Sequence, residues 1–330
     1  MRVKRSPLEW ATNWGARRRL LPPWGKPSHH PVFSSFPAPA VADRSFDTDY
    51  LGIRTQPEML PPHWVSPPFE ERPPYPPVDE EYLEWIDVLE AVCEAEGTFT
   101  MLEVGAGYAR WAARGWIAAR RRGLAARIGI VEADPQHVAW ASSHLAFNSV
   151  PASDIRLYEV AVGAARGKTV FIVEMPPGYA GNNPKDWYGQ ALPETDDQGR
   201  SAPTTRQYYG RPLLDLPDSW GGIEVDIVSL DEILADYEYL DLVDFDIQGV
   251  EDKVIESSID ALTRKVRRLH IGTHSRAIDA TVMRTLAAAG WTCIRAYPCL
   301  RWNRTEFGWI EFNDGVQTWI NPKLERHSGR

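Results

Sequence analysis

The sequence predicts an α/β protein built on a doubly wound, mostly parallel sheet. From residue 79 onward, short apolar strands alternate with segments whose apolar residues recur at helical spacing, which is the pattern of parallel strands joined by crossover helices. A glycine-rich turn follows the first of these strands, and charged residues follow several later ones. Because open α/β sheets bind ligands at the carboxyl ends of their strands, the same pattern predicts a binding site at that edge.

The expected elements follow one another regularly along the chain. Apolar residues at helical spacing predict a first helix, with an inward face of Tyr82, Trp85, Ile86, Leu89 and Val92. Further helices are expected at residues 108–122, 250–262 and 278–289, together with one that Asp134 caps and Pro135 opens. Strands are expected at residues 99–104, 127–131, 155–162, 169–173, 240–245, 266–271 and 292–297. Residues 308–312 and 316–320 are expected to form a C-terminal hairpin, which adds an antiparallel strand to the sheet.

Composition disfavours several classes of protein. The 330 residues carry a net charge of −9, which disfavours a nucleic-acid binder and a membrane-surface binder. No apolar run reaches the roughly 18 residues of a membrane span. Three widely spaced cysteines support neither a disulfide framework nor a zinc site, and no apolar segment of a secretory signal follows the basic N-terminus. We therefore expect a cytoplasmic protein with no membrane or nucleic-acid partner, for which a homodimer is compatible with the sequence.

Residues 1–78 differ from the rest of the chain. They contain 16 of the 27 prolines, and proline is excluded from regular helices and central strands. The segment is also too aromatic for a solvated linker, so we expect a proline-rich arm whose rings pack on the body formed by residues 79–330. The aromatic residues concerned are Trp10, Trp14, Trp24, Phe33, Phe36, Tyr50, Trp64, Phe69 and Tyr75.

Within the body, residues 174–222 lack strong periodicity. Nearly fifty such residues inside a compact pattern predict a functional loop or lid. Aromatic and cationic side chains in it would suit a sugar, an aromatic or an acidic acceptor, or would anchor the loop: Trp187, Tyr188, Arg206, Tyr208, Tyr209 and Arg211.

The first predicted strand ends in Glu103-Val-Gly-Ala-Gly107. A glycine-rich turn lets a ligand approach the backbone closely, and the start of the following helix favours the polar end of that ligand. A dinucleotide fingerprint would place a third glycine near Arg110, so the large side chain there disfavours NAD. The alternative is the Glu-x-Gly-x-Gly loop that wraps S-adenosylmethionine (SAM), in which Glu103 acts on the amino-acid part. Glu103, Gly105, Ala106 and Gly107 are therefore candidate cofactor-binding residues.

The second strand of the body ends in another acid. Glu132 follows Gly107 by 25 residues. An acid at this position can accept hydrogen bonds from both ribose hydroxyls, whether the cofactor is SAM or NAD. We expect Glu132 and its neighbour Ala133 to contact the nucleoside part of the cofactor.

Two later strands end in the candidate catalytic residues. Asp246 stands where one apolar strand ends, and His274 follows the next strand. Because adjacent strand ends share one edge of the sheet, both side chains are expected to face one cleft. A histidine can accept a proton from a hydroxyl near neutral pH, while a carboxylate orients it or binds a metal. The structural alternative is that His274 caps a helix and Asp246 binds loop amides.

These motifs, in this order, resemble the FkbM-type SAM-dependent methyltransferases. The resemblance covers roughly residues 98–320, and it rests on Glu103-Val-Gly-Ala-Gly107, Val131-Glu-Ala-Asp-Pro135, Tyr158-Glu-Val-Ala-Val-Gly163, Val228-Ser-Leu-Asp-Glu232 and Val243-Asp-Phe-Asp-Ile-Gln-Gly-Val-Glu251. The last segment is similar to the Asp-x-Glu-Gly-x-Glu signature of the family. The resemblance implies a class I methyltransferase (Rossmann-like) fold with SAM as cofactor, and commonly the O-methylation of a hydroxyl on a sugar or natural-product small molecule.

Two residues depart from the family pattern. Gln248 stands where the family usually has Glu, and Gly272 stands where its next strand often has an acid. If those acids bind a metal or act as a base, this chain must use Asp246, Glu251 or His274 instead, with a divalent cation such as Mg²⁺ as a candidate second cofactor. Two rival functions stay open: an NAD-dependent oxidoreductase, and a non-catalytic binding module on a methyltransferase-like fold.

Overall fold

A computed structural model describes residues 29–40, 46–60, 72–174, 176, 202–299 and 301–324. Some residues singled out in the sequence lie outside these ranges: Trp10, Trp14, Trp24, Trp64 and Phe69 of the arm, and Trp187 and Tyr188 of the expected lid. Within the described ranges, no helix has both the length and the apolar character needed to cross a membrane.

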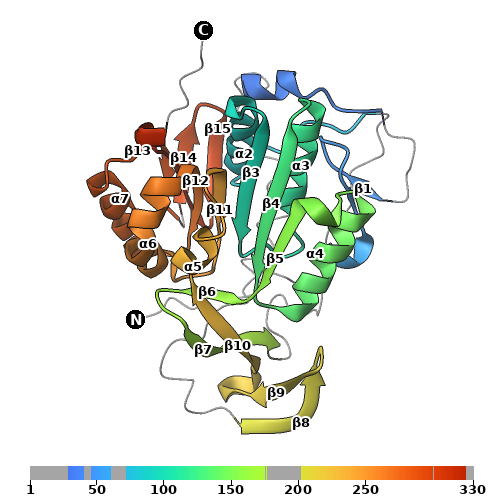
Figure 1. Ribbon diagram of the computed structural model, residues 1–330, viewed down its shortest axis with the longest axis vertical. Helices are drawn as coiled ribbons and strands as arrows, with labels where there is room; N and C mark the ends of the chain where they lie inside the picture. Colours follow the sequence, from blue (N-terminus) through green and yellow to red (C-terminus); the bar gives the residue numbers. More distant parts are fainter. Residues whose placement is uncertain are drawn as a thin grey trace.

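A seven-stranded sheet forms the centre of the molecule (Figure 1). Its strand order is β13-β16-β12-β11-β3-β4-β5. The bounds are β3 (Thr98–Val104), β4 (Ala125–Glu132), β5 (Ile155–Glu159), β11 (Leu240–Phe245), β12 (Val266–Thr273), β13 (Thr292–Tyr297) and β16 (Gly315–Ile320). All pairings are parallel except those of β16, which runs antiparallel to both β12 and β13. The predicted α/β class, with a mostly parallel sheet and an antiparallel strand near one edge, is confirmed.

Helices cover both faces of this sheet (Figure 1). On one face lie α2 (Tyr82–Glu94), α3 (Arg110–Arg121) and α4 (Pro135–Phe147), and on the other lie α5 (Leu230–Leu234), α6 (Glu251–Lys265) and α7 (Arg276–Ala288). The five predicted inward residues of α2 are all buried. Asp134 caps α4 as predicted, because its carboxylate accepts a hydrogen bond from the backbone N–H of Gln136 at 2.8 Å.

A second, smaller sheet lies at one end of the main sheet, at the bottom of Figure 1. It contains β6 (Ala161–Gly163), β7 (Gly167–Glu174), β8 (Ala202–Tyr208), β9 (Arg211–Asp215) and β10 (Gly221–Ser229). The sequence predicted β7, but it predicted no strand at β8, β9 or β10, and it joined β5 and β6 into one strand. Residues 202–222, the described end of the predicted loop at residues 174–222, are therefore largely β-strand. Leu213, Ile223 and Val225 give this sheet a small apolar core of its own.

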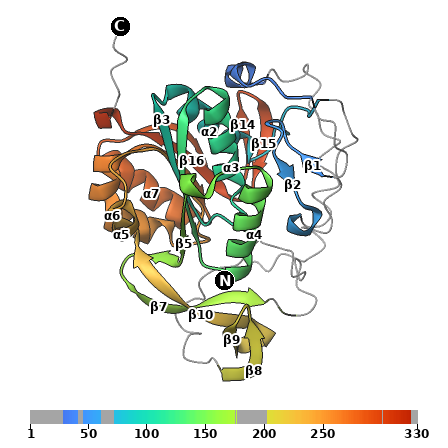
Figure 2. The ribbon, with the colours of Figure 1, turned by 45° about the vertical axis from the view of Figure 1, so that its right-hand side comes forward.

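The predicted C-terminal hairpin has a different partner strand. β15 (Gly308–Phe312) pairs antiparallel with β14 (Arg301–Thr305) in a separate two-stranded sheet, and not with β16. The reason is that β12 and β13 occupy both edges of β16, which leaves β16 no free edge for β15. Figure 2 shows β14 and β15 beside α2, and Phe307, Ile310 and Phe312 belong to the same apolar cluster as this helix.

The described parts of residues 1–78 lie against the α2 side of the body (Figure 2). Their short elements are η1 (Pro31–Ser35), β1 (Asp47–Thr48), β2 (Arg54–Thr55) and η2 (Pro57–Met59). Phe33, Phe36 and Tyr50 are buried in the same cluster as the apolar residues of α2. The ring of Phe33 stacks on that of Tyr82 with 5.4 Å between centroids, and the Tyr82 hydroxyl accepts a hydrogen bond from the backbone N–H of His30 at 3.0 Å.

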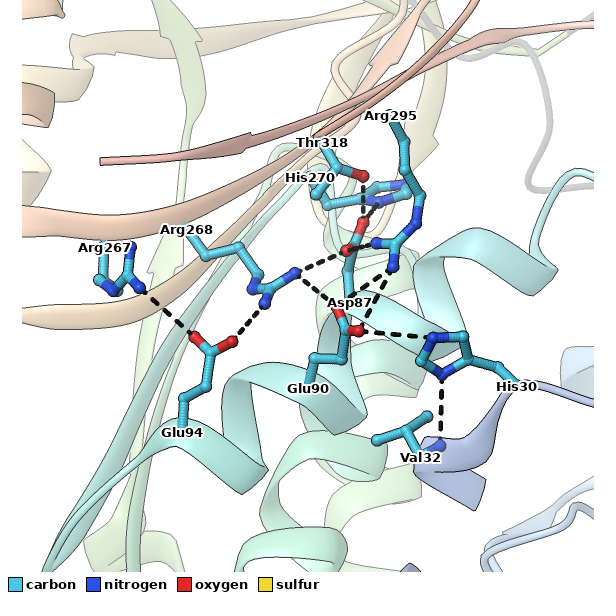
Figure 3. A network of polar contacts seen from close by, with 10 residues as sticks. All are labelled: His30, Val32, Asp87, Glu90, Glu94, Arg267, Arg268, His270, Arg295 and Thr318. Atoms are coloured by element: carbon cyan, nitrogen blue, oxygen red, sulfur yellow. Dashed lines mark hydrogen bonds and ion pairs between the residues drawn. The ribbon is translucent and has the colours of Figure 1, made fainter. Parts of the chain in front are cut away.

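A buried network of ion pairs joins α2 to the sheet (Figure 3). Asp87, which has no exposed surface, accepts hydrogen bonds from Arg268 at 3.0 Å and from Arg295 at 2.8 Å. Its second carboxylate oxygen lies 2.7 Å from Nδ1 of His270 and accepts the hydroxyl of Thr318. Because a buried carboxylate is stable only when it is paired and hydrogen-bonded, this network fixes the position of α2 against β12, β13 and β16.

We predict that Asp87→Ala lowers the free energy of unfolding by about 3 kcal/mol or more, because it leaves Arg268 and His270 buried without their shared partner. The control is Glu94→Ala on the same helix. Glu94 also contacts Arg268, but its side chain is 45% exposed, so we expect a loss of about 1 kcal/mol or less. Urea unfolding of both variants measures the difference, and equal losses would contradict this account of the network.

Candidate active site

The glycine turn after β3 is fixed by a close backbone contact. Gly105 has a φ of +86°, a conformation that side-chain-bearing residues rarely adopt. A Cβ atom added to it would lie 1.7 Å from the carbonyl oxygen of Asp246. The N–H of Asp246 donates to the carbonyl of Val104 at 2.9 Å, and the N–H groups of Gly105 and Ala106 donate to the carbonyl of Val131 at 2.9 and 3.1 Å. The turn therefore holds the carboxyl ends of β11, β3 and β4 together.

Glu103 points toward the start of α3. Its carboxylate accepts hydrogen bonds from the backbone N–H groups of Ala112 at 2.7 Å and Trp111 at 3.3 Å. Burial, together with the nearby Asp244, raises the pKa of Glu103 to about 8. The residue before the helix, Ala109, offers no side-chain cap, so Glu103 satisfies the first turn of α3 in its place. Glu103 thus stabilises the junction between the glycine loop and α3.

Glu132 joins the two loops at the ends of β3 and β4. One of its carboxylate oxygens accepts the N–H of Gly107 at 2.7 Å, and the other accepts the N–H groups of Ala133 at 2.7 Å and Asp134 at 2.8 Å. A carboxylate oxygen can accept two hydrogen bonds, so the oxygen bound to Gly107 keeps one lone pair for a further donor.

An open pocket with about 660 Å³ of empty space lies at these strand ends, and some of this space is open solvent. Five residues predicted from the sequence line it: Gly105, Gly107, Glu132, Ala133 and Asp246. Glu103, Ala106 and His274 do not line it. Its position is the edge at which open α/β sheets bind ligands.

Several residues of this pocket were not predicted from the sequence. Val160, Val162 and Phe171 form an apolar wall, and the ring of His137 has Nδ1 3.9 Å from the carboxylate of Glu132. Val160 and Val162 follow the third parallel strand, so the rule that ligands bind at carboxyl ends would have found them. Phe171 comes from the smaller sheet, and no local pattern points to it.

The predicted catalytic pair is part of a three-residue cluster, Asp246, Glu251 and His274. His274 Nε2 lies 3.2 Å from a carboxylate oxygen of Asp246, and His274 Nδ1 lies 2.6 Å from one of Glu251. Asp246 has 48% of its side chain exposed, whereas Glu251 is fully buried at the start of α6. The sequence missed Asp314, which lies 3.9 Å from Nε2 of His274.

The surroundings of His274 favour its charged form. Burial lowers the pKa of its ring, but Asp246 and Glu251 outweigh burial and raise the pKa to about 11. A histidine with this pKa already carries its proton at neutral pH, so it is poorly suited to the predicted role of proton acceptor. For Asp246, burial raises the pKa, but His274 outweighs it and the net shift is downward. Asp246 is therefore an exposed carboxylate that His274 holds in place.

The two departures from the family pattern lie beside Asp246. The amide nitrogen of Gln248 donates to an Asp246 carboxylate oxygen at 3.2 Å, and Gln248 adopts a φ of +60°. A Cβ atom on Gly272 would lie 3.4 Å from Cγ of Asp246. In place of those two acids, Asp246 has a neutral hydrogen-bond donor on one side and a closely packed glycine on the other.

The same cluster fits a divalent metal poorly. Ligand atoms of Asp246, Glu251 and His274 lie within 4.8 Å of one another. A histidine ligand must offer a nitrogen lone pair, however, and both ring nitrogens of His274 already contact carboxylates. Mg²⁺ also prefers oxygen ligands. These three residues form an ion-paired cluster, and no catalytic step is assigned to a metal there.

Comparison with known proteins finds methyltransferases. A protein of Jannaschia sp. (strain CCS1), described as "Putative methyltransferase", is 27% identical over 289 residues, which cover 86% of this chain and 95% of the relative. No protein-family model matches the chain.

Among solved structures, the chain is similar to a precorrin-6y C5,15-methyltransferase from Geobacter metallireducens GS-15, with 11% identity, a TM-score of 0.37, and coverage of 72% of this chain and 86% of that one. It is also similar to a methyltransferase FkbM from Methylobacillus flagellatus KT, with 13% identity, a TM-score of 0.37, and coverage of 68% and 44%. Similarity at this level identifies no substrate.

We predict that Gly105→Ala is destabilised by about 3 kcal/mol or more and loses ligand binding, because the added methyl group would overlap the backbone of Asp246. Gly97→Ala is the matched control. Gly97 also has a positive φ, +69°, but no atom lies within 4 Å of its added Cβ, so only about 1 kcal/mol should be lost. Thermal unfolding compares the two variants. Equal stability losses would show that the contact with Asp246 is unimportant.

We also predict that His274 stays protonated at both ring nitrogens up to about pH 9, and that Asp246→Asn lowers its pKa by one unit or more. Because the pKa of His274 is raised on folding, its contribution to stability is fully present below about pH 6.5 and is lost as the pH rises toward 11. Nitrogen-15 NMR of the imidazole rings measures the pKa. Titration near pH 6.5 in both proteins would refute the ion-paired cluster.

Proposed function

We propose that this chain is a SAM-dependent methyltransferase that methylates a hydroxyl group of a small molecule, a sugar or another natural product. The observation that carries the proposal is the pocket between Glu132 and Asp246, at the carboxyl ends of β3, β4 and β11. The methyltransferase relative, which aligns with most of the chain, supports the broader assignment. The motifs shared with FkbM-type enzymes support the narrower one, O-methylation.

The pocket residues fit the parts of SAM. The lone pair left on Glu132 would accept a ribose hydroxyl, and Val160, Val162 and Phe171 would contact the adenine. Gly105 and Gly107 line the pocket, and the amino-acid part of SAM would approach the backbone of this loop. When bound, SAM supplies an electrophilic methyl group.

Asp246 is the residue best suited to hold the acceptor. Its exposed carboxylate would accept a hydrogen bond from the acceptor hydroxyl and so align the oxygen with the cofactor. His274 and Gln248 each contact the same carboxylate oxygen, so both act as positioning residues. Because methyl transfer is a direct displacement, alignment and the exclusion of water are the chief contributions of the protein.

We further propose a cytoplasmic enzyme. The described cysteines, Cys93, Cys293 and Cys299, are free thiols, which supports a reducing compartment. Its partner would be a small-molecule acceptor, with no nucleic acid or membrane involved, and a homodimer is compatible with the proposal.

Isothermal titration calorimetry with SAM, S-adenosylhomocysteine and NAD separates this function from its two rivals. We expect S-adenosylhomocysteine to bind with a Kd in the micromolar range and NAD not to bind. Glu132→Ala should weaken the nucleoside contact and raise this Kd about tenfold or more. Binding of NAD alone would favour an oxidoreductase, and binding of none of the three would favour a non-catalytic module.

Transfer of labelled methyl groups from SAM to a metabolite extract tests the role of Asp246. Asp246→Asn should reduce transfer at least 100-fold while changing the Kd for S-adenosylhomocysteine by no more than a few-fold. Asp226→Asn, which changes an exposed residue of β10, is the control and should retain full transfer. Full transfer by Asp246→Asn would exclude the proposed contact with the acceptor.

A further inference from the structure

We infer a second binding site, for a divalent transition-metal ion, formed by Glu84 of α2, Asp244 of β11 and His270 of β12. Each of these residues offers one ligand atom, and the three atoms lie within 4.8 Å of one another. The cluster is separate from Asp246, Glu251 and His274, and it does not depend on the proposed methyl transfer. Two carboxylate oxygens and one imidazole nitrogen are a ligand set that suits Mn²⁺ or Zn²⁺.

His270 is oriented as a metal-binding histidine would be. Its Nδ1 lies 2.7 Å from a carboxylate oxygen of Asp87, and Asp87 is itself fixed by Arg268, Arg295 and Thr318 (Figure 3). A carboxylate that accepts the Nδ1–H of an imidazole leaves Nε2 with its lone pair, as in carboxylate–histidine–metal arrangements. In the other cluster the carboxylate at Nδ1 of His274 is that of Glu251, which is itself one of the three clustered residues.

Asp244 supplies an independent sign of a missing ligand. Only 3% of its surface is exposed, and its oxygen Oδ1 has no hydrogen-bond partner among the described residues. In the sheet it is paired with Glu103 on one side and with His270 on the other. A buried carboxylate oxygen without a partner is costly, and a bound cation would remove that cost.

The charges around the cluster leave room for a cation. Asp244 shares a hydrogen bond with Glu84 and interacts electrostatically with Glu103, and the charge of Arg110 acts on all three acids. The guanidinium of Arg110 forms two hydrogen bonds with Glu81, and Arg268 is bound to Asp87 and Glu90. These arginines therefore have carboxylate partners of their own.

The site would lie close to the acceptor position. Asp244 is the last residue but one of β11, Asp246 follows the strand directly, and the two carboxylates interact electrostatically. An ion bound at Asp244 would thus lie on the acceptor side of the sheet edge, and it would also join α2 to β11 and β12.

Metal binding to the full-length protein tests the inference. After dialysis against EDTA and then metal-free buffer, Mn²⁺ is titrated and free Mn²⁺ is measured by electron paramagnetic resonance, and Zn²⁺ is titrated by calorimetry. We expect about one equivalent of either ion to bind. Glu84→Gln and Asp244→Asn should each weaken binding tenfold or more.

Glu251→Gln is the matched control, because it alters the other histidine–carboxylate cluster, and it should retain wild-type affinity. Circular dichroism and thermal unfolding establish that each variant is folded, and only the wild type and the control should gain thermal stability when metal is added. Absence of binding to the wild type, loss in Glu251→Gln, or unchanged binding in folded Glu84→Gln would each overturn the inference. Titration of S-adenosylhomocysteine into the same samples reports separately on the cofactor pocket.

Discussion

The backbone of Asp246 rests directly on Gly105, and the rest of the site depends on this contact. It leaves no space for a Cβ atom, and it is held by a hydrogen bond from Asp246 to the end of β3. Because the ends of β3 and β11 are fixed to each other in this way, the exposed carboxylate of Asp246 lies at the pocket that Glu132 also lines. Under the proposed function, backbone contacts that tolerate little change would set the distance between the cofactor and its acceptor.

The acids at the sheet edge serve different purposes. Glu103 and Glu132 both bind backbone amides, so they shape the glycine loop before any ligand arrives. Asp246, in contrast, keeps a large exposed surface. Asp87 and Glu251 are fully buried, and each orients a histidine, His270 in the first case and His274 in the second. These two buried acids therefore hold both histidine rings in fixed orientations.

Much of the architecture could be predicted because its causes are local. Helical spacing predicted α2, the Asp-Pro pair predicted the start of α4, and the apolar strand ends predicted the position of Asp246. The smaller sheet could not be predicted in the same way, because β8 to β10 are stabilised by pairing with one another and by a few distant apolar residues. The partner of β15 was mistaken because turn residues do not reveal that β16 has both edges occupied.

The charge of the His274 ring likewise could not be predicted from the sequence. Its position after β12 could be predicted, but its pKa depends on Glu251, which α6 brings beside it from a different part of the chain. From its position near a strand end, His274 was predicted to act as a base. The carboxylates of Asp246 and Glu251 instead keep its ring protonated. In the proposed function, Asp246 is therefore the residue that would bind the acceptor hydroxyl.

The most direct test of this account is a crystal structure of the protein with S-adenosylhomocysteine. The account predicts the ribose hydroxyls within hydrogen-bonding distance of Glu132, the adenine against Val162 and Phe171, and the sulfur atom facing Asp246. A ligand bound outside this pocket, or one whose sulfur points away from Asp246, would contradict it.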